Sequence, residues 1–386
     1  MSDSENYKSD DGIQSEFNPN VTYQDVLDNY NYEGESDGKY EYFAEGEEGF
    51  EAYEDRNKKV RYQWSRSILE EDALTDNVLT ADEAGKCLSR IGQVGCGLLY
   101  AYIQIDVDHR NLTDIEVITK FRCLSLVNVS HNDLDLTALD VLRDLDYVVV
   151  LRADRNRVDS LCLSSMAYLQ VLTLNSNRVS SLSGLKQPSL ECLELNDNVI
   201  SHLIQNPDEN FDGEYCSEID CPNLSTLALS RNALETIEQF MFVSIKLRVL
   251  YLSYNKIDKL KGLEHLSNLS HLHLRGNQIS SLDGFTDNLK HLSYLNLREN
   301  LLHDTDELTK LVCLKSLKTL VVSHNSFRKN PRSIAKKVLK LLPWLERIDK
   351  GTVSTVQSDN GVKGSQVYSD SGESGQDEDE GSYEEK

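Results

Sequence analysis

The residues of this 386-residue chain that could do chemistry fall in two places, and the first is an acidic stretch near position 210. Asp208, Asn210 and Asp212, followed by Gly213, have the spacing of oxygen ligands that opens an EF-hand calcium loop. The twelfth position of such a loop is Ile219, where a bidentate glutamate is needed. An acidic surface loop is therefore the favoured interpretation, with a calcium site as the alternative.

The second place is a histidine pair, His271 and His273, which flanks one leucine and so shares one face of a strand. A metal pair is the less favoured interpretation, and exposed surface histidines are the favoured one. Cys216 and Cys221 have the spacing of a metal clip but lack the second pair that a zinc site needs. The chain also lacks an H-E-x-x-H motif, a phosphate-binding glycine loop and a G-x-S-x-G motif. We therefore expect no catalysis, no metal, no cofactor and no small-molecule substrate.

The histidine pair lies inside a pattern that occurs twice in residues 247–285. Each copy reads apolar-x-x-apolar-x-apolar-x-x-Asn-x-apolar, and the first copy uses Leu247, Leu250, Leu252, Asn255 and Ile257. The leucines alternate along a short strand, and the apolar residues that follow fall three apart, which is typical of 3₁₀-like turns. This is the pattern of a leucine-rich repeat, whose units must stack because none can bury its own apolar face.

The asparagine of the pattern recurs along most of the chain. Counted from Arg110, which fills the first slot, the intervals are 22, 24, 21, 21, 34, 23, 22, 23 and 25 residues. An amide side chain at the turn after each strand can hydrogen-bond the backbone of neighbouring turns, so we predict a structural role. The predicted structural asparagines are Asn132, Asn156, Asn177, Asn198, Asn232, Asn255, Asn277, Asn300 and Asn325.

The predicted fold is an α/β solenoid, a horseshoe of about ten repeats of 21–25 residues with a parallel concave sheet. Thr80 and Glu83 form a capping box, which predicts a helix that runs to about Ile91 and is stopped by Gly92. A second amphipathic helix ends at Pro343. The predicted regions are an N-terminal tail (1–77), an N-terminal cap helix (78–101), the repeats (102–330) with an acidic insertion (205–221), a C-terminal cap helix (331–350) and a C-terminal tail (351–386).

The net charge of −24 lies in the two tails. Residues 1–55 carry 17 acidic residues and two lysines, and residues 351–386 carry nine acidic residues and two lysines. Both tails are poor in aliphatic residues, so we expect them to be disordered, the tyrosine-rich N-terminal one either solvated or folding on a partner. The nearly neutral middle has no basic excess for phosphates, so nucleic acid is not an expected partner.

Composition also predicts the compartment. No run approaches the roughly 18 apolar residues of a membrane helix, so we expect no membrane insertion. The N-terminus is acidic, unlike a signal peptide, and the eight cysteines form no dense cluster beside the repeats. We therefore expect a reducing, intracellular location.

With no catalytic motif, the predicted function lies on the concave surface. In the C-terminal half the residues between the strand leucines are tyrosine, histidine and arginine, and Tyr and Arg are the types enriched at binding hot spots. We expect this face to dock a protein segment, and its cationic character favours an acidic one; the alternative is an ordinary solvated sheet. The candidate binding residues are Tyr251, Tyr254, His271, His273, Arg275, Tyr294, Asn296 and Arg298.

Three stretches resemble a known family. They are GLLYAYIQIDVDHRNLTDI (97–115), LSNLSHLHLRGNQISSLDGF (266–285) and LPWLERIDK (342–350). They resemble the family of leucine-rich repeat-containing protein 23, over about residues 78–350. The resemblance implies a non-catalytic scaffold of the axonemal radial spokes in motile cilia and flagella, needed for motility, that contacts spoke-head proteins. It thereby implies a cytoplasmic, cytoskeletal location in the axoneme. The repeats also resemble a regulatory subunit that binds a Ser/Thr protein phosphatase, which is the alternative function.

Overall fold

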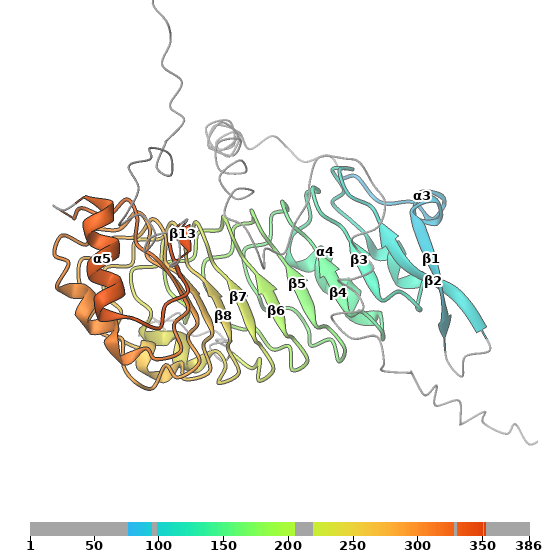
Figure 1. Ribbon diagram of the computed structural model, residues 1–386. Coiled ribbons are helices and arrows are strands. Elements are labelled where there is room, and N and C mark those ends of the chain that lie inside the picture. The colour runs from blue at the N-terminus through green and yellow to red at the C-terminus, as the bar shows by residue number, and fades with distance from the viewer. Residues whose placement is uncertain (1–75, 95–98, 205–218, 328–329, 350, 353–386) are drawn as a thin grey trace, which may run out of the picture.

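The strands form one sheet in which every strand lies beside the next one in the sequence. The predicted stacking of repeats in chain order is therefore confirmed, and Figure 1 shows the strands following one another along the molecule. The computed structural model describes residues 76–94, 99–204, 219–327, 330–349 and 351–352.

The parallel part of the sheet begins with a longer strand and continues with strands of two or three residues. Each central leucine, such as Leu250 or Leu272, is fully buried, and its two neighbours point to the other face. The parallel strands are β2 (Leu99–Asp106), β3 (Leu126–Asn128), β4 (Val150–Arg152), β5 (Val171–Thr173), β6 (Cys192–Glu194), β7 (Thr226–Ala228), β8 (Val249–Tyr251), β9 (His271–His273), β10 (Tyr294–Asn296), β11 (Thr319–Val321) and β12 (Arg347–Ile348).

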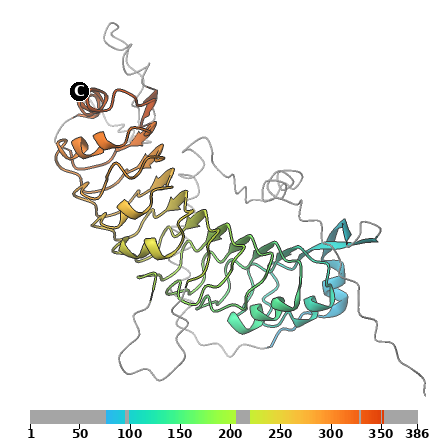
Figure 2. The ribbon, with the colours of Figure 1, turned by 90° about the horizontal axis from the view of Figure 1, so that it is seen from below.

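Short helices lie in some of the connections that return the chain from one strand to the next, namely β2–β3, β3–β4, β7–β8, β8–β9 and β10–β11. Most are 3₁₀ helices, as the apolar spacing of three predicts. In Figure 2 the strands line the inner side of a bend and the short helices line its outer side. These helices are η1 (Glu116–Lys120), α4 (Leu136–Asp140), η2 (Val141–Asp144), η3 (Glu238–Phe242), η4 (Leu263–His265) and η5 (Glu307–Cys313).

The N-terminal cap differs from the predicted single helix. Helix α3 (Ala81–Lys86) begins at the expected capping box, with both Thr80–Glu83 hydrogen bonds formed. It ends at Lys86, however, and strand β1 (Leu88–Val94) pairs antiparallel with β2. The expectation of a helix to Ile91 is wrong because the outer edge of β2 carries backbone N–H and C=O groups that need partners, and β1 supplies them.

The C-terminal cap contains the predicted helix and two short strands. Helix α5 (Pro331–Leu341) starts at Asn330, whose side chain accepts the N–H of Ser333, and buries Ile334 and Val338 against the last repeat. The predicted range of 331–350 is not all helix, because β12 follows and pairs parallel with β11. Strand β13 (Gly351–Thr352) then pairs antiparallel with β12.

The predicted acidic tails lie outside the described residues, apart from the few that flank the solenoid. The same holds for most of the insertion, including Asp208, Asp212 and Cys216. The insertion rejoins the fold by Ile219, because Asp220 forms a parallel bridge with Lys186 and Cys221 is 1% exposed in the core. No helix among the described residues is long and apolar enough to cross a bilayer.

Candidate protein-binding face

The asparagine ladder, defined as the nine predicted structural asparagines, connects every repeat to the one before it. In each case the side-chain oxygen accepts a backbone N–H of the preceding repeat and the side-chain nitrogen donates to one of its carbonyls. Asn277, for example, accepts from Ile257 N–H at 3.1 Å and donates to Leu252 O at 2.9 Å. The structure thus shows the bonding that was predicted from the repeat pattern.

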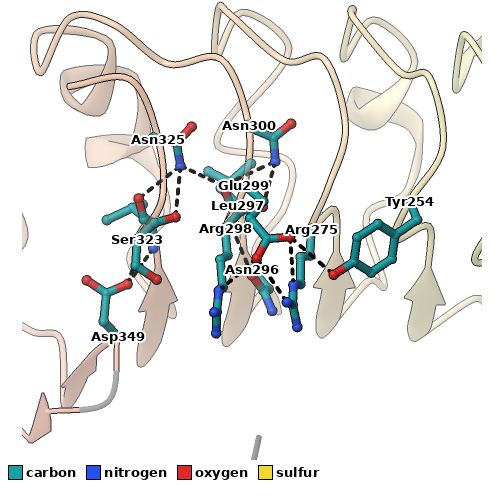
Figure 3. Close-up of polar contacts among 11 residues, drawn as sticks. Tyr254, Arg275, Asn296, Leu297, Arg298, Glu299, Asn300, Ser323, Asn325 and Asp349 are labelled. Carbon is teal, nitrogen blue, oxygen red and sulfur yellow. Dashed lines mark hydrogen bonds and ion pairs between the residues drawn. The ribbon is translucent and has the colours of Figure 1, made fainter. Parts of the chain in front are cut away.

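A different residue ends the ladder. Directly after strand β12, one carboxylate oxygen of Asp349 accepts the N–H groups of Val322 and Ser323, both at 2.8 Å (Figure 3). Unlike the amide of a ladder asparagine, this carboxylate acts here as an acceptor alone. The two backbone N–H groups that follow β11 therefore also have a hydrogen-bond acceptor.

The inner face of β8–β10 carries an aromatic row, defined as Tyr251, His271, His273 and Tyr294. The ring of His273 lies 4.5 Å from that of Tyr251 and 4.7 Å from that of Tyr294. The ring of Tyr294 also lies 5.8 Å from that of His271. The ring planes are inclined by 21–31° and the centroid distances lie in or near the range that aromatic pairs favour, so the four side chains form one continuous surface across three strands.

Burial favours the neutral form of three members of the aromatic row, Tyr251, His271 and His273. Burial lowers the pKa of His273 to about 3, with a smaller effect from His271, and burial also lowers the pKa of His271. Burial raises the pKa of Tyr251, so its phenol stays protonated. The row therefore offers flat rings with few charges to desolvate on binding.

Beside the aromatic row lies an arginine–glutamate cluster, defined as Tyr254, Arg275, Arg298 and Glu299. Arg275 donates to both Glu299 oxygens at 2.9 and 3.3 Å, and the Tyr254 hydroxyl donates to the same carboxylate at 3.1 Å (Figure 3). Arg298 Nε lies 3.3 Å from Glu299 Oε1. Burial opposes ionisation of Glu299, but the hydrogen bonds from Arg275 and Tyr254 and the positive charges of Arg275 and Arg298 outweigh it and hold its pKa below the ordinary value.

Gly276 makes this cluster possible. It occupies the slot before Asn277 with φ +67, a left-handed conformation that glycine adopts without steric cost. A Cβ there would lie 2.5 Å from the ring of Tyr254, so the ring crosses an entire repeat to reach Glu299 only because position 276 has no side chain. Tyr254 also lies under Arg275, with its ring centre 5.4 Å from the guanidinium carbon.

The structure brings the eight candidate binding residues together on one face but leaves few of them open. His271 is exposed, Arg275 is 9% exposed and Asn296 is 7% exposed, and the other five are half-buried. Asn296 accepts the N–H of Arg298 at 3.0 Å and so also shapes the turn.

Sequence reasoning missed Glu299 and Gly276, both of which hold the arginine–glutamate cluster together. Both residues occupy the position directly before a ladder asparagine, where the backbone is left-handed in every repeat. A comparison of this position between repeats could have found them, because Gly276 is the one glycine among the residues that precede the nine ladder asparagines.

The N-terminal half of the inner face is different in kind. There the first residues of successive strands form an apolar stripe that is buried separately from the main core. The stripe consists of Leu126, Val149, Val150, Val171 and Cys192. Over β3–β6 the first strand positions of the inner face are thus apolar and the third positions polar, whereas over β8–β10 the face is aromatic and ionic.

Comparison with known proteins decides the family. The chain is 34% identical over 294 residues to human "Leucine-rich repeat-containing protein 23", an alignment that covers 70% of this chain and 75% of the relative. The chain belongs to the leucine-rich repeat-containing protein 23 family. The Xenopus tropicalis protein of that name is 36% identical over 264 residues, covering 68% of this chain and 71% of the relative.

Two family models match within the repeats. "Leucine rich repeat" matches residues 222–279 and "Leucine Rich repeats (2 copies)" matches residues 267–310, and neither describes an enzyme. Among solved structures, a leucine-rich repeat protein of Leptospira interrogans aligns with a TM-score of 0.45 at 19% identity, over 65% of this chain and 72% of that one. The family assignment and the strand order together make this a leucine-rich-repeat protein of the kind that binds other proteins.

Proposed function

We propose that the chain is a non-catalytic scaffold that binds a segment of another protein across the inner face of β8–β10. The observation that carries this proposal is the aromatic row, a continuous surface made by four rings on three adjacent strands. Aromatic side chains give large contact area at low cost in conformational entropy. The neighbouring arginine–glutamate cluster supplies charge that can fix the orientation of the bound segment.

The partner we propose is a subunit of the axonemal radial spoke in motile cilia or flagella. The support is the family: the resemblance of the repeats and of the closing LPWLERIDK to leucine-rich repeat-containing protein 23 implies that setting. The proposed location is correspondingly the cytoskeleton of the axoneme, and the proposed role is in motility.

The test of the binding face is affinity purification of the full chain from ciliated cells, with the recovered proteins quantified by mass spectrometry. The variant combines Tyr251→Ala, Tyr294→Ala and Arg275→Ala. We expect recovery of the main partner to fall at least tenfold, because two rings of the aromatic row and one guanidinium are lost.

The matched control removes the same side-chain types from the N-terminal end. It combines Tyr100→Ala, Tyr102→Ala and Arg110→Ala, all at exposed positions. Both variants must keep the circular-dichroism spectrum and melting temperature of a folded solenoid. Unchanged partner recovery with the folded β8–β10 variant would refute the proposed face.

Localisation separates the radial spoke from the phosphatase-regulator alternative. A spoke component stays with the axoneme after detergent extraction, whereas a regulatory subunit is recovered in a soluble complex with a Ser/Thr phosphatase. Recovery only in that soluble complex would leave the scaffold role standing and overturn the proposed setting.

A further inference from the structure

Asp108, His109 and His131 come together at the N-terminal end of the solenoid, away from the proposed binding face. His109 and His131 occupy equivalent slots in successive repeats, each at the left-handed turn that follows a strand, with φ of 53 and 55. Their rings stack with centroids 3.7 Å apart and planes 17° apart. Each offers one ligand atom and Asp108 offers a carboxylate oxygen, and these atoms all lie within 4.8 Å of one another.

The backbone holds these three side chains in place. The N–H of His109 donates to Ser130 O at 3.2 Å, and the N–H of His131 donates to Asp154 O at 2.8 Å, so both turns are fixed to the next repeat. His109 Nδ1 lies 2.9 Å from Asp108 Oδ2. The backbone therefore fixes where the three side chains begin, and only their side-chain torsions need to change when an ion enters.

His131 is the residue whose environment points to a ligand. Its Nδ1 is buried and has no hydrogen-bond partner within the described part of the chain, which is costly for a polar ring atom. Histidine binds metals through an unprotonated ring nitrogen, so a ring nitrogen without a hydrogen bond is available as a ligand atom.

We propose that Asp108, His109 and His131 bind a divalent transition metal, with Zn²⁺ as the best match to two imidazoles and one carboxylate. Zinc–nitrogen and zinc–oxygen bonds are about 2.0–2.2 Å, so bound ligand atoms lie about 3–4 Å apart. Rotation of the imidazoles out of their stack closes the remaining distance. The side chains of His109 and Asp108 are 64% and 43% exposed, which leaves an entry path and room for water as a fourth ligand.

The other histidine pair lacks this arrangement. Tyr294 stacks against both His271 and His273, so these imidazoles form part of the aromatic row. Among the described residues, the set around Asp108 is the one group of three potential ligands close enough to share an ion.

The test is titration of the full-length chain, first freed of metal with a chelator, using Zn²⁺ in calorimetry and Co²⁺ as an absorption probe. We expect one equivalent to bind at this site and to raise the melting temperature. His131→Gln and His109→Gln should each weaken that binding at least tenfold, because each removes one of three protein ligands. His303→Gln, at an exposed position outside the cluster, should leave it unchanged.

The variant with both His109→Gln and His131→Gln decides the origin of any binding. It should fold as the unsubstituted chain does without metal, and Zn²⁺ should no longer raise its melting temperature through this site. Equal Zn²⁺ affinity in the double variant would place the ion elsewhere in the chain and overturn the proposal. So would the absence of Zn²⁺ and Co²⁺ binding by the unsubstituted chain.

Discussion

At the residue scale, each ladder asparagine is used because its amide is both a donor and an acceptor. Asn277 accepts one backbone N–H of the preceding repeat and donates to Leu252 O and Leu274 O. Aspartate could accept but not donate, and it would bury a charge without a cation beside it. The contrast with Asp349 is informative, because that residue accepts two N–H groups at the end of the ladder.

Asn277→Ala should lower the free energy of unfolding by about 1–3 kcal/mol, because the N–H of Ile257 and two carbonyls lose their partner inside the protein. Chemical denaturation of both proteins measures the difference. The matched control is Asn288→Ala, at an exposed position, which should stay within about 0.5 kcal/mol of the unsubstituted chain. Equal effects of the two substitutions would contradict the structural role of the ladder.

A second residue-scale prediction concerns acid. Because burial holds the pKa of His273 at about 3, against 6.5 ordinarily, the unfolded chain takes up this proton as the pH falls below 6.5 while the folded chain does not. The free energy of unfolding is therefore unaffected by this residue above pH 6.5. Below pH 6.5 it falls as the unfolded chain binds the proton, by about 1–2 kcal/mol at pH 5.

Comparison of variants isolates that contribution from those of other groups. The fall in unfolding free energy between pH 7 and pH 5 should be smaller by about 1–2 kcal/mol in His273→Gln than in the unsubstituted chain. His303→Gln, which changes an exposed histidine, should keep the whole fall. A His273→Gln chain with the same pH dependence as the unsubstituted protein would show that this imidazole is not buried.

At the scale of elements, the caps cover ends that a stack of repeats cannot cover itself. Helix α5 turns Ile334, Ala335 and Val338 toward the core and leaves Lys336 in solvent. Trp344, just beyond it, donates its indole N–H to Leu314 O at 3.1 Å. The last repeat therefore has its apolar side closed by a helix and its strand paired with β12.

A pair of substitutions in α5 tests this role. Val338→Asp buries a carboxylate against the last repeat and should cost about 3 kcal/mol or more. Lys336→Asp introduces the same residue two positions away on the exposed side and should cost under about 1 kcal/mol. Thermal unfolding compares the two, and similar melting temperatures would contradict α5 as a core-covering cap.

The repeat spacing was sufficient to predict the strands, their order and the asparagine ladder, because these depend on contacts that recur every 21–25 residues. It was insufficient for β1, since residues 88–94 become a strand only through the open edge of β2. The repeat spacing could not predict the burial of Arg275 either. That burial depends on Tyr254 crossing Gly276 to reach Glu299, a contact between residues 45 positions apart.

At the scale of the whole molecule, the solenoid is nearly one-dimensional. Each strand pairs only with the strands before and after it, and neighbouring strands lie about 4.8 Å apart, so β5 and β8 are separated by about 14 Å. Stability in such a stack is roughly a sum of repeats and their nearest-neighbour contacts. A destabilising substitution near β5 should therefore loosen the repeats around β5 more than those that carry the aromatic row on β8–β10, and the reverse should hold for one near β8.

Two substitutions in the core test this separation. Leu172 in β5 and Leu250 in β8 are both 0% exposed, and truncation to alanine at either site should cost about 2–5 kcal/mol. Hydrogen exchange measured by mass spectrometry on the full chain should quicken most in β4–β6 for Leu172→Ala and in β7–β9 for Leu250→Ala. Val199→Ala, at a position 58% exposed, serves as the control and should change little. If both leucine variants quickened exchange equally in all strands, the repeats would unfold as one cooperative unit and the two halves of the face would not be independent.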